Sequence, residues 1–322
     1  MKICTITCSN SDNHGARLQA YALARYLKDQ GHEVSIIDYR PPYLDPSYRV
    51  IYWPGASLKE WAKLFLRFPQ RVRSKIRHKS FVSFSERHLP LTSKIYRSIQ
   101  DLRQDPPLAD LYIAGSDQIW NTFLPNGTDP AFYLDFGHVS IRRESFAASF
   151  ATTDLRSGTE EFVRTQLSRF DKISVRERNG LDILKRLGIH GGVREDDPVF
   201  LLSAKQWDEL SDKTGEGDRY LLVYDFFSDR RLKQKAKAIA KSNQLKIYSI
   251  SPVWNTYADR NFATAGPESF VALVRNATCV VTNSFHAIAF CLIFQREFVF
   301  VERPDGLNER ITDLLECRGQ TV

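Results

Sequence analysis

The sequence of 322 residues has no long hydrophobic run, few cysteines and no glycine-rich phosphate loop. No apolar stretch approaches the roughly 18 residues that a membrane-spanning helix needs, which argues against an integral membrane protein. The opening stretch MKICTITCSNSDNHG turns polar by Ser9. It lacks the longer apolar core and the small-residue cleavage site of a signal peptide, so we expect no export and a cytoplasmic location.

The cysteines argue against two common kinds of stabilised site. Cys4, Cys8, Cys279, Cys291 and Cys317 include no CxxC pair and are odd in number, which disfavours both a zinc ribbon and a disulfide framework. Most lie in apolar runs, where we expect reduced thiols that pack in the core. No group of histidines and carboxylates has metal-ligand spacing, so no metal is expected. The missing GxGxxG loop argues against a dinucleotide cofactor, and we expect no cofactor.

The positive charge of the chain is concentrated in one segment. Residues 59–79 contain eight bases and one acid, a net charge of +7 that equals the formal net charge of the whole chain. The remainder is formally neutral and shows no known nucleic-acid-binding module, so we expect no nucleic acid partner. Within residues 58–81, apolar residues recur every three or four positions with bases between them. This pattern predicts an amphipathic helix pair broken near Pro69.

Three roles are open for this basic segment. It could pack its apolar stripe on the N-terminal domain and leave its bases in water. It could instead make peripheral contact with the inner membrane, where each base near an anionic surface contributes about 1 kcal/mol and Trp, Phe and Leu side chains add apolar burial. Its bases could also steer an anionic substrate.

Expected strands and helices alternate along most of the chain. Strands are expected at residues 2–7, 33–38, 111–115, 172–175, 219–226, 245–250, 278–282 and 297–301. Helices are expected at residues 16–31, 177–187, 230–242, 267–276, 287–294 and 308–316. This alternation predicts an α/β protein with two Rossmann-like domains facing a cleft. We place the domains at residues 1–190, with the basic helical insertion near 57–81, and at residues 191–322.

Four polar clusters follow expected strands at points where helices begin. They are NSDNHGA (residues 10–16), GSDQIWN (115–121), VRERNG (175–180) and TNSFHA (282–287). In open α/β sheets, ligands bind beyond the carboxyl ends of strands, near helix N-termini whose free N–H groups attract anions. We therefore expect the four clusters to converge on one cleft.

Five stretches carry a resemblance to a known family. In chain order, DNHGARLQAYAL, GSDQIWN, SVRERNGLDILKRLGI, DDPVFLL and TNSFHAIAFCLIFQREFVFV resemble the polysaccharide pyruvyl transferase family. The resemblance covers residues 1–315, apart from 43–81 and parts of 152–170, and implies a fold like that of the two-Rossmann GT-B glycosyltransferases. It also implies a transferase of exopolysaccharide biosynthesis without a cofactor. Such an enzyme moves the pyruvyl group of phosphoenolpyruvate onto two hydroxyls of a sugar or lipid-linked oligosaccharide as a ketal, and releases phosphate.

This reaction requires cations or N–H groups for the donor anions, an acid for the methylene carbon, and a path for the hydroxyl proton. By the resemblance, Arg176 binds the donor and His286 is the acid, with Asn283 and Ser284 also at the donor. Relatives carry Arg-Leu-His where this chain has Ser284-Phe285-His286. The Ser284 hydroxyl and the N–H groups of the next helix would then replace one arginine contact.

The other candidates are expected to bind the acceptor or line the cleft. They are Asn13, His14, Ser116, Asp117, Gln118, Trp120 and Asn121. Structural roles are the alternative for several of these: Asn13 in the turn before a helix, Asp117 and Asn121 as backbone caps, and Trp120 as packing. Arg176 could likewise pair with Glu177 or another carboxylate, and we expect Asp197, before Pro198, to be structural.

Two other functions fit the same expected fold. A glycosyltransferase that uses a nucleotide sugar would be revealed by stabilisation with UDP- or GDP-linked sugars. A non-catalytic protein that binds a sugar or an anion would keep the cleft without turnover, and the absent arginine favours this alternative.

Overall fold

The structure is a computed structural model that describes residues 1–44, 58–303 and 308–319, with residues 58–67 described by their backbone alone. The chain divides into two compact units. The first unit comprises Met1–Asp45, His88–Ser203 and Glu302–Val322, and the second comprises Pro46–Arg87 and Ala204–Val301.

This division differs from the predicted domains in three places. The boundary falls after Ser203 instead of residue 190, the basic segment belongs to the second unit, and the chain returns to the first unit at Glu302. Residue 57, near the predicted start of the insertion, lies outside the described residues. Hydrophobic periodicity follows the order of elements along the chain, whereas a compact unit depends on which elements pack together. The sequence pattern therefore could not show that the chain passes from one unit to the other at these places.

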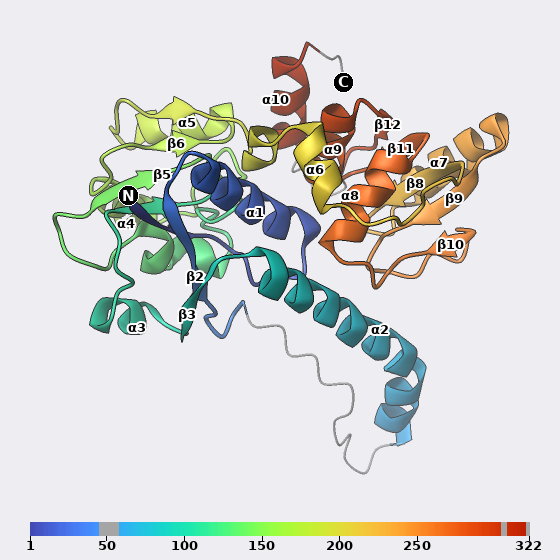
Figure 1. Cartoon of the computed structure of the whole chain (residues 1–322), viewed down its shortest axis with the longest axis horizontal. Helices are drawn as coiled ribbons and strands as arrows, with labels where there is room; N and C mark the ends of the chain where they lie inside the picture. The colour runs from blue at the N-terminus through green and yellow to red at the C-terminus, as the bar shows by residue number, and fades with distance from the viewer. Residues whose placement is uncertain (45–57, 304–307, 320–322) are drawn as a thin grey trace. The chain divides into compact units, whose positions relative to one another are not determined.

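The first unit is built on a five-stranded parallel sheet (Figure 1). Its order is β3-β2-β1-β4-β5, formed by β1 (Lys2–Ile6), β2 (Glu33–Tyr39), β3 (Leu91–Tyr96), β4 (Leu111–Ala114) and β5 (Arg142–Ser145). Two further strands, β6 (Ser174–Val175) and β7 (Val193–Arg194), pair in parallel beyond β5. The helices are α1 (His14–Asp29), α3 (Ile99–Gln104), α4 (Glu160–Leu167), α5 (Arg178–Arg186) and α10 (Glu309–Cys317), with 3-10 turns η1 (Pro125–Thr128), η2 (Pro130–Tyr133) and η3 (Pro198–Leu201).

The second unit repeats this topology. Its parallel sheet has the order β10-β9-β8-β11-β12, formed by β8 (Tyr220–Tyr224), β9 (Lys246–Ser249), β10 (Arg260–Asn261), β11 (Cys279–Thr282) and β12 (Glu297–Phe300). The helices are α2 (Leu58–His88), α6 (Ala204–Leu210), α7 (Arg230–Asn243), α8 (Pro267–Asn276) and α9 (Phe285–Phe294). Both sheets follow a 3-2-1-4-5 order, which is a Rossmann-type arrangement. The prediction of an α/β protein with two Rossmann-like domains is confirmed.

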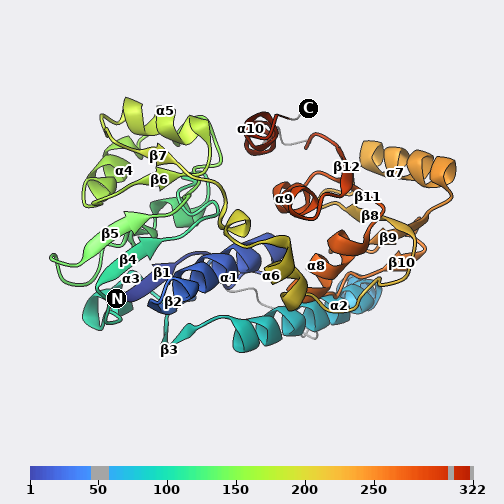
Figure 2. The same cartoon turned by 45° about the horizontal axis from the view of Figure 1, so that its top comes forward.

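Strand alternation explains how each sheet is covered. In the first unit, Ile3 and Ile113 pack with Leu23 of α1, while Ile6 and Tyr112 belong to a second apolar cluster. Successive side chains of a strand point to opposite faces, so α1 covers one face and an aromatic core covers the other. In the second unit, α7 packs on Leu221 and Val223. On the opposite face, the Tyr220 hydroxyl donates to the Leu273 carbonyl of α8 at 2.8 Å, and Figure 2 shows α7 and α8 on opposite sides of the sheet.

Helix α2 is one continuous helix through Pro69, where the sequence predicted two helices. An interior proline removes one hydrogen bond and disfavours the helix by about 3 kcal/mol. Packing in the second half of α2 opposes this cost. Phe81 and Phe84 are fully buried, and Ser80 donates to the Thr264 carbonyl at 3.0 Å within the second unit. Among the described residues, no helix combines the length and apolar character needed to cross a bilayer.

The order of the strands places the polar clusters at two reversal points of the sheets. In the first unit the chain reverses direction across the sheet between β1 and β4, and in the second between β8 and β11. Ligands of open α/β sheets bind outside the carboxyl ends of the strands at such points. Residues 10–16 follow β1, residues 115–121 follow β4, and residues 282–287 follow β11.

Candidate functional site

The turn after β1 holds Asn13 and His14 at the start of α1. Asn13 is the N-cap, and its Oδ1 accepts a hydrogen bond from the Ala16 N–H at 3.3 Å. His14 is fully buried. Thr7, at the end of β1, donates to the Ser116 carbonyl at 2.7 Å and accepts from the Gln19 side chain at 2.9 Å. The structure therefore gives Asn13 a capping role and links the β1 and β4 ends directly.

The motif after β4 divides into a packing half and a polar half. Trp120 is fully buried, stacks on Tyr133, and donates from its indole N–H to the Phe132 carbonyl at 3.1 Å. Asn121 accepts from the Phe123 N–H at 3.1 Å. Both side chains thus serve the core and the turn, as the structural alternative proposed, and Trp120 does not line an open surface.

The polar half of this motif lies beside buried charges. Asp117 has a φ of 76°, a left-handed conformation that is uncommon for a residue other than glycine. The Ser116 hydroxyl is fully buried and lies 3.5 Å from Oδ2 of Asp197. Asp197 also caps η3 by accepting from the Val199 N–H at 3.1 Å, which agrees with its expected structural role.

Arg176 follows β6 and is 3% exposed. Its Nη1 lies 2.6 Å from Oδ2 of Asp197, and its Nε lies 3.6 Å from Oε2 of Glu177. Burial alone lowers the pKa of Arg176, but Asp197, Glu177 and Asp117 outweigh this effect and raise the pKa above its ordinary value. Arg176 is therefore a buried, charged group whose charge is already opposed by carboxylates.

Glu177 continues this buried polar group. It is 2% exposed, and its Oε1 accepts from the Ser149 hydroxyl at 2.6 Å and from the Ala151 N–H at 2.9 Å. Among the described residues, its Oε2 has no hydrogen-bond partner. One carboxylate oxygen is thus fixed by the turn after β5, and the other faces Nε of Arg176 at 3.6 Å.

Sequence reasoning missed Arg310, which joins the same group from α10. Arg310 is 6% exposed and lies near Arg176, Glu177 and Asp117. Burial, and then the charge of Arg176, lower the pKa of Arg310 to about 10. A sequence signal existed, because Arg310 falls four positions before Leu314 on the buried stripe of the helix.

The second unit has its own polar group at the reversal point. The Asn283 side chain donates from Nδ2 to Oδ1 of Asp225 at 2.9 Å, and both residues are buried. Asp225 is held by N–H groups of Phe227 at 2.9 Å and Asp229 at 2.7 Å. Among the described residues, Oδ1 of Asn283 has no hydrogen-bond partner. An amide oxygen is thus positioned at the end of β11.

Ser284 and His286 open helix α9. Ser284 is the N-cap, and its Oγ accepts from the Ala287 N–H at 3.4 Å. His286 is 8% exposed and contacts the Phe285 ring edge to face. Free N–H groups at a helix N-terminus favour an anion, and a histidine there can donate a hydrogen bond or a proton to one. The structure thus brings Asn283, Ser284 and His286 together.

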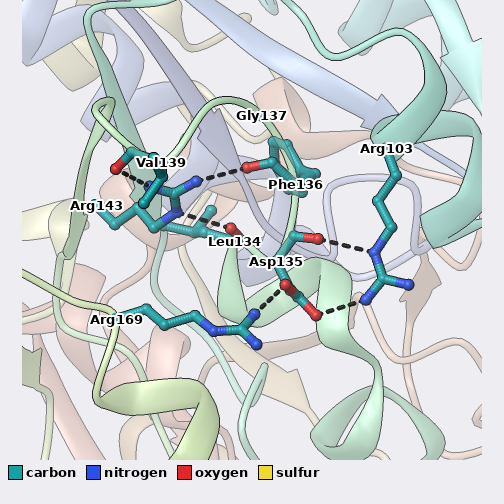
Figure 3. Close-up of a pocket in the computed structure, with 8 residues that line it drawn as sticks. All are labelled: Arg103, Leu134, Asp135, Phe136, Gly137, Val139, Arg143 and Arg169. Atoms are coloured by element: carbon teal, nitrogen blue, oxygen red, sulfur yellow. Dashed lines mark hydrogen bonds and ion pairs between the residues drawn. The ribbon is translucent and has the colours of Figure 1, made fainter.

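A separate pocket of about 500 Å³ lies at the opposite, amino end of β5 (Figure 3). Arg103 and Arg169 both bind the Asp135 carboxylate there. Arg143 donates to five backbone carbonyls, those of Leu134, Phe136, His138, Val139 and Ile141. Its donors are used to hold the loop between η2 and β5, so this pocket is structural and separate from the strand-end groups.

Three of the five cysteines are core thiols, as expected, whereas Cys8 is half-buried and Cys317 is exposed. All five are free, Cys4, Cys279 and Cys291 are buried, and burial raises the pKa of Cys4 to about 11. Within the residues that the structure describes, no group of three or more His, Cys, Asp or Glu side chains is arranged to hold a metal ion.

Comparisons with solved structures find distant similarity. The chain is similar to the UDP-GlcNAc 2-epimerase from Methanocaldococcus jannaschii, with 13% identity, a TM-score of 0.48, and coverage of 98% of this chain and 92% of that chain. It is also similar to the E. coli heptosyltransferase WaaC, with 10% identity, a TM-score of 0.41, and coverage of 99% and 100%. A glycosyltransferase, SsfS6 of Streptomyces sp. SF2575, gives 12% identity, a TM-score of 0.41, and coverage of 99% and 86%.

No curated protein matches the chain. The family model described as polysaccharide pyruvyl transferase matches residues 13–305. The matched region contains the turn after β1, the motif after β4, Arg176 and the start of α9. Because the match spans nearly the whole chain, the protein belongs to the polysaccharide pyruvyl transferase family and is a transferase.

Proposed function

We propose that the protein transfers the pyruvyl group of phosphoenolpyruvate onto two hydroxyls of one sugar in a cell-surface polysaccharide precursor. The observation that carries the proposal is a buried guanidinium, Arg176, at the carboxyl end of a parallel strand. A planar guanidinium suits the carboxylate and phosphate of this donor. In the second unit, the buried N-terminus of α9 offers N–H donors, with the Ser284 hydroxyl and the His286 side chain beside them. No cofactor is needed.

The proposed chemistry conserves every atom of donor and acceptor. His286 protonates the methylene carbon of phosphoenolpyruvate, and the first sugar hydroxyl attacks C2 and loses its proton. The C2–O bond to phosphate then breaks, and a second hydroxyl attacks the same carbon. One hydroxyl proton is retained in the new methyl group through the acid, and the other leaves with inorganic phosphate. Interactions that strengthen as positive charge develops at C2 would accelerate the reaction.

The residues predicted to bind the acceptor or line the cleft receive unequal support from the structure. Asp117 and Gln118 lie near Arg176 or Arg310, and Ser116 lies 3.5 Å from Asp197, the partner of Arg176, so we propose all three for acceptor or donor binding. Asn13 and Asn121 are committed to backbone caps, and Trp120 to the core. These three would then act by holding the turns in place.

The test is phosphate release from phosphoenolpyruvate with a panel of lipid-linked and nitrophenyl sugars. Phosphoenolpyruvate should also raise the melting temperature, by an amount equivalent to about 2.7 kcal/mol at a hundredfold excess over its Kd. A melting shift with UDP- or GDP-sugars and none with phosphoenolpyruvate would instead identify a nucleotide-sugar glycosyltransferase. Binding of phosphoenolpyruvate without phosphate release for any acceptor would favour a non-catalytic binding protein.

We also propose that the protein works in the cytoplasm with peripheral contact to the inner membrane through α2. Lys75, Ile76 and Lys79 are exposed on this helix, and the Ile76 side chain offers apolar contact beside the bases. Arg77 is excluded from such a surface, because it is buried and lies over the Phe81 ring. Lipid-linked acceptors would be presented at that membrane surface.

Liposome sedimentation tests the membrane contact. The wild-type protein should sediment with anionic vesicles at low salt, and screening should release it as salt rises. Replacing Arg73, Lys75 and Lys79 by Gln should abolish binding. A charge-matched variant with Lys235, Lys237 and Lys241 of α7 replaced by Gln should bind like wild type, because these exposed bases lie on another helix. Equal loss in both variants would show only a general charge effect.

A further inference from the structure

The structure holds a second buried guanidinium whose hydrogen bonds are incomplete. Arg310 lies in the first turn of α10, and its neighbours Ile311, Leu314 and Leu315 are also buried. One polar atom of the Gln118 amide lies 2.9 Å from Nη2 and 3.1 Å from Nη1 of Arg310. Because a guanidinium only donates, this atom is the amide oxygen. Among the described residues, Nε of Arg310 has no hydrogen-bond partner.

A comparison with Arg143 of the same unit shows that the incomplete hydrogen bonding of Arg310 is unusual. Arg143 is equally buried, at 7% exposure, but its guanidinium donates to five backbone carbonyls. A buried charge without compensating hydrogen bonds is costly, and a structural arginine avoids this cost as Arg143 does. Arg310 has one neutral amide oxygen as its acceptor. Its environment is therefore incomplete in a way that an added anion would complete.

The charges around Arg310 indicate what is missing. Arg176 and Arg303 oppose its positive charge, and Glu177 and Asp117 favour it. Among the described residues, no ion pair joins Arg310 to either carboxylate, whereas Arg176 is paired with Asp197 at 2.6 Å. The charge of Arg176 is therefore partly neutralised before any ligand binds. A donor with both a phosphate and a carboxylate has two anionic groups, and each is a strong hydrogen-bond partner for a guanidinium.

We propose that Arg310 supplies this cation and binds a phosphate or carboxylate group of the ligand, with Gln118 as the residue that positions its guanidinium. The identification of that ligand as phosphoenolpyruvate rests on the proposed function. The anion site itself does not, because it follows from the burial and unfilled hydrogen bonding of Arg310. Arg176 and Arg310, which both belong to the first unit, would then be the two guanidinium groups of the proposed donor site.

The experiment measures melting temperatures of the full chain with phosphoenolpyruvate, inorganic phosphate or pyruvate. Arg310→Met should melt near the wild-type temperature without ligand, because few hydrogen bonds are lost. It should need about tenfold to a hundredfold more phosphoenolpyruvate for the same shift. Arg310→Lys should be intermediate, because it keeps the charge but loses the planar fork. Arg318→Met is the matched control, since Arg318 lies just beyond the same helix and pairs with Asp196 at 2.8 Å.

The outcomes separate this inference from the proposed function. If inorganic phosphate stabilises the wild type as well as phosphoenolpyruvate does, and Arg310→Met loses that response, the donor assignment fails while the anion site stands. Identical responses of wild type and Arg310→Met to every anion overturn the inference, as does a wild type that responds to none of the three. If Arg310→Met is too unstable to measure, Arg310→Lys decides: unchanged affinities overturn the inference and weakened ones support it.

Discussion

At the scale of single residues, two buried arginines of the first unit differ in how their hydrogen bonds are used. Arg143 and Arg310 are both buried arginines, but only Arg143 has its donors distributed over backbone carbonyls. Exposure therefore does not separate a structural arginine from a binding one, and the completeness of hydrogen bonding does. Substitution of Arg143 should therefore lower the stability of the protein, whereas substitution of Arg310 should mainly weaken ligand binding.

Arg143→Met should lower the free energy of unfolding by about 3 kcal/mol or more, because several buried carbonyls lose charged donors at once. Denaturant unfolding measures this. Arg142→Met is the matched control: the adjacent arginine is 61% exposed in its side chain and pairs with Glu144, so less than about 1 kcal/mol should be lost. Equal losses in the two variants would contradict the structural role of Arg143.

His286→Ala should reduce turnover by about a hundredfold or more if this histidine delivers the proton to the methylene carbon. His286→Gln, which keeps a hydrogen-bond donor but cannot relay a proton, should retain ligand binding and remain slow. The control is His138→Ala, because His138 is exposed and contacts Ser140 in a surface turn. Wild-type turnover by a folded His286→Ala protein would leave His286 with a packing role only.

At the scale of elements, α2 contains a proline whose destabilising effect on the helix is offset by packing. Pro69→Ala should raise the free energy of unfolding by roughly 1 to 3 kcal/mol, since alanine restores the backbone donor and removes the ring clash. Gln70→Ala, at the exposed neighbouring position, should change stability little. Thermal unfolding compares the two. A destabilised Pro69→Ala protein would contradict this expectation and show that the packing of α2 needs the proline.

The elements found from the sequence were those whose residues show an apolar pattern. The helix predicted at residues 267–276 has those bounds in the structure, and each predicted strand has a counterpart. By contrast, β3 and β5 were missed. The sequence of β5 is RRES, and β3 places three exposed residues in succession, so neither shows the apolar pattern of a core strand.

The residues of the candidate site that lie at strand ends and helix starts could be predicted from the sequence. Arg176, Asn283, Ser284 and His286 were found because each follows an apolar strand. Arg310 follows no strand, and its place beside Arg176 depends on the return of the chain to the first unit. Trp120 was expected to line the cleft because its motif follows a strand end, whereas in the structure Tyr133, Phe150 and Phe170 surround it in a core.

At the scale of the whole chain, α10 is attached to the first unit by charge. Asp313 is 11% exposed in its side chain and lies 3.1 Å from both Arg178 and Arg194. Asp313→Asn should lower the free energy of unfolding by about 1 to 3 kcal/mol, because two partly buried arginine contacts lose their counterion. Glu316→Gln is the control, since that pair with Arg178 is largely exposed and should contribute less than about 1 kcal/mol. Equal stabilities would mean that apolar packing alone holds α10.

The return of the chain at Glu302 has a consequence for synthesis. A ribosome makes the chain from its N-terminus, so the sheet of the first unit is complete long before α10 exists. Until the last residues emerge, Arg178 and Arg194 have no Asp313 to contact, and Arg176 has no Arg310 beside it. A nascent or prematurely terminated chain without α10 therefore lacks Arg310, the second arginine proposed to bind the ligand.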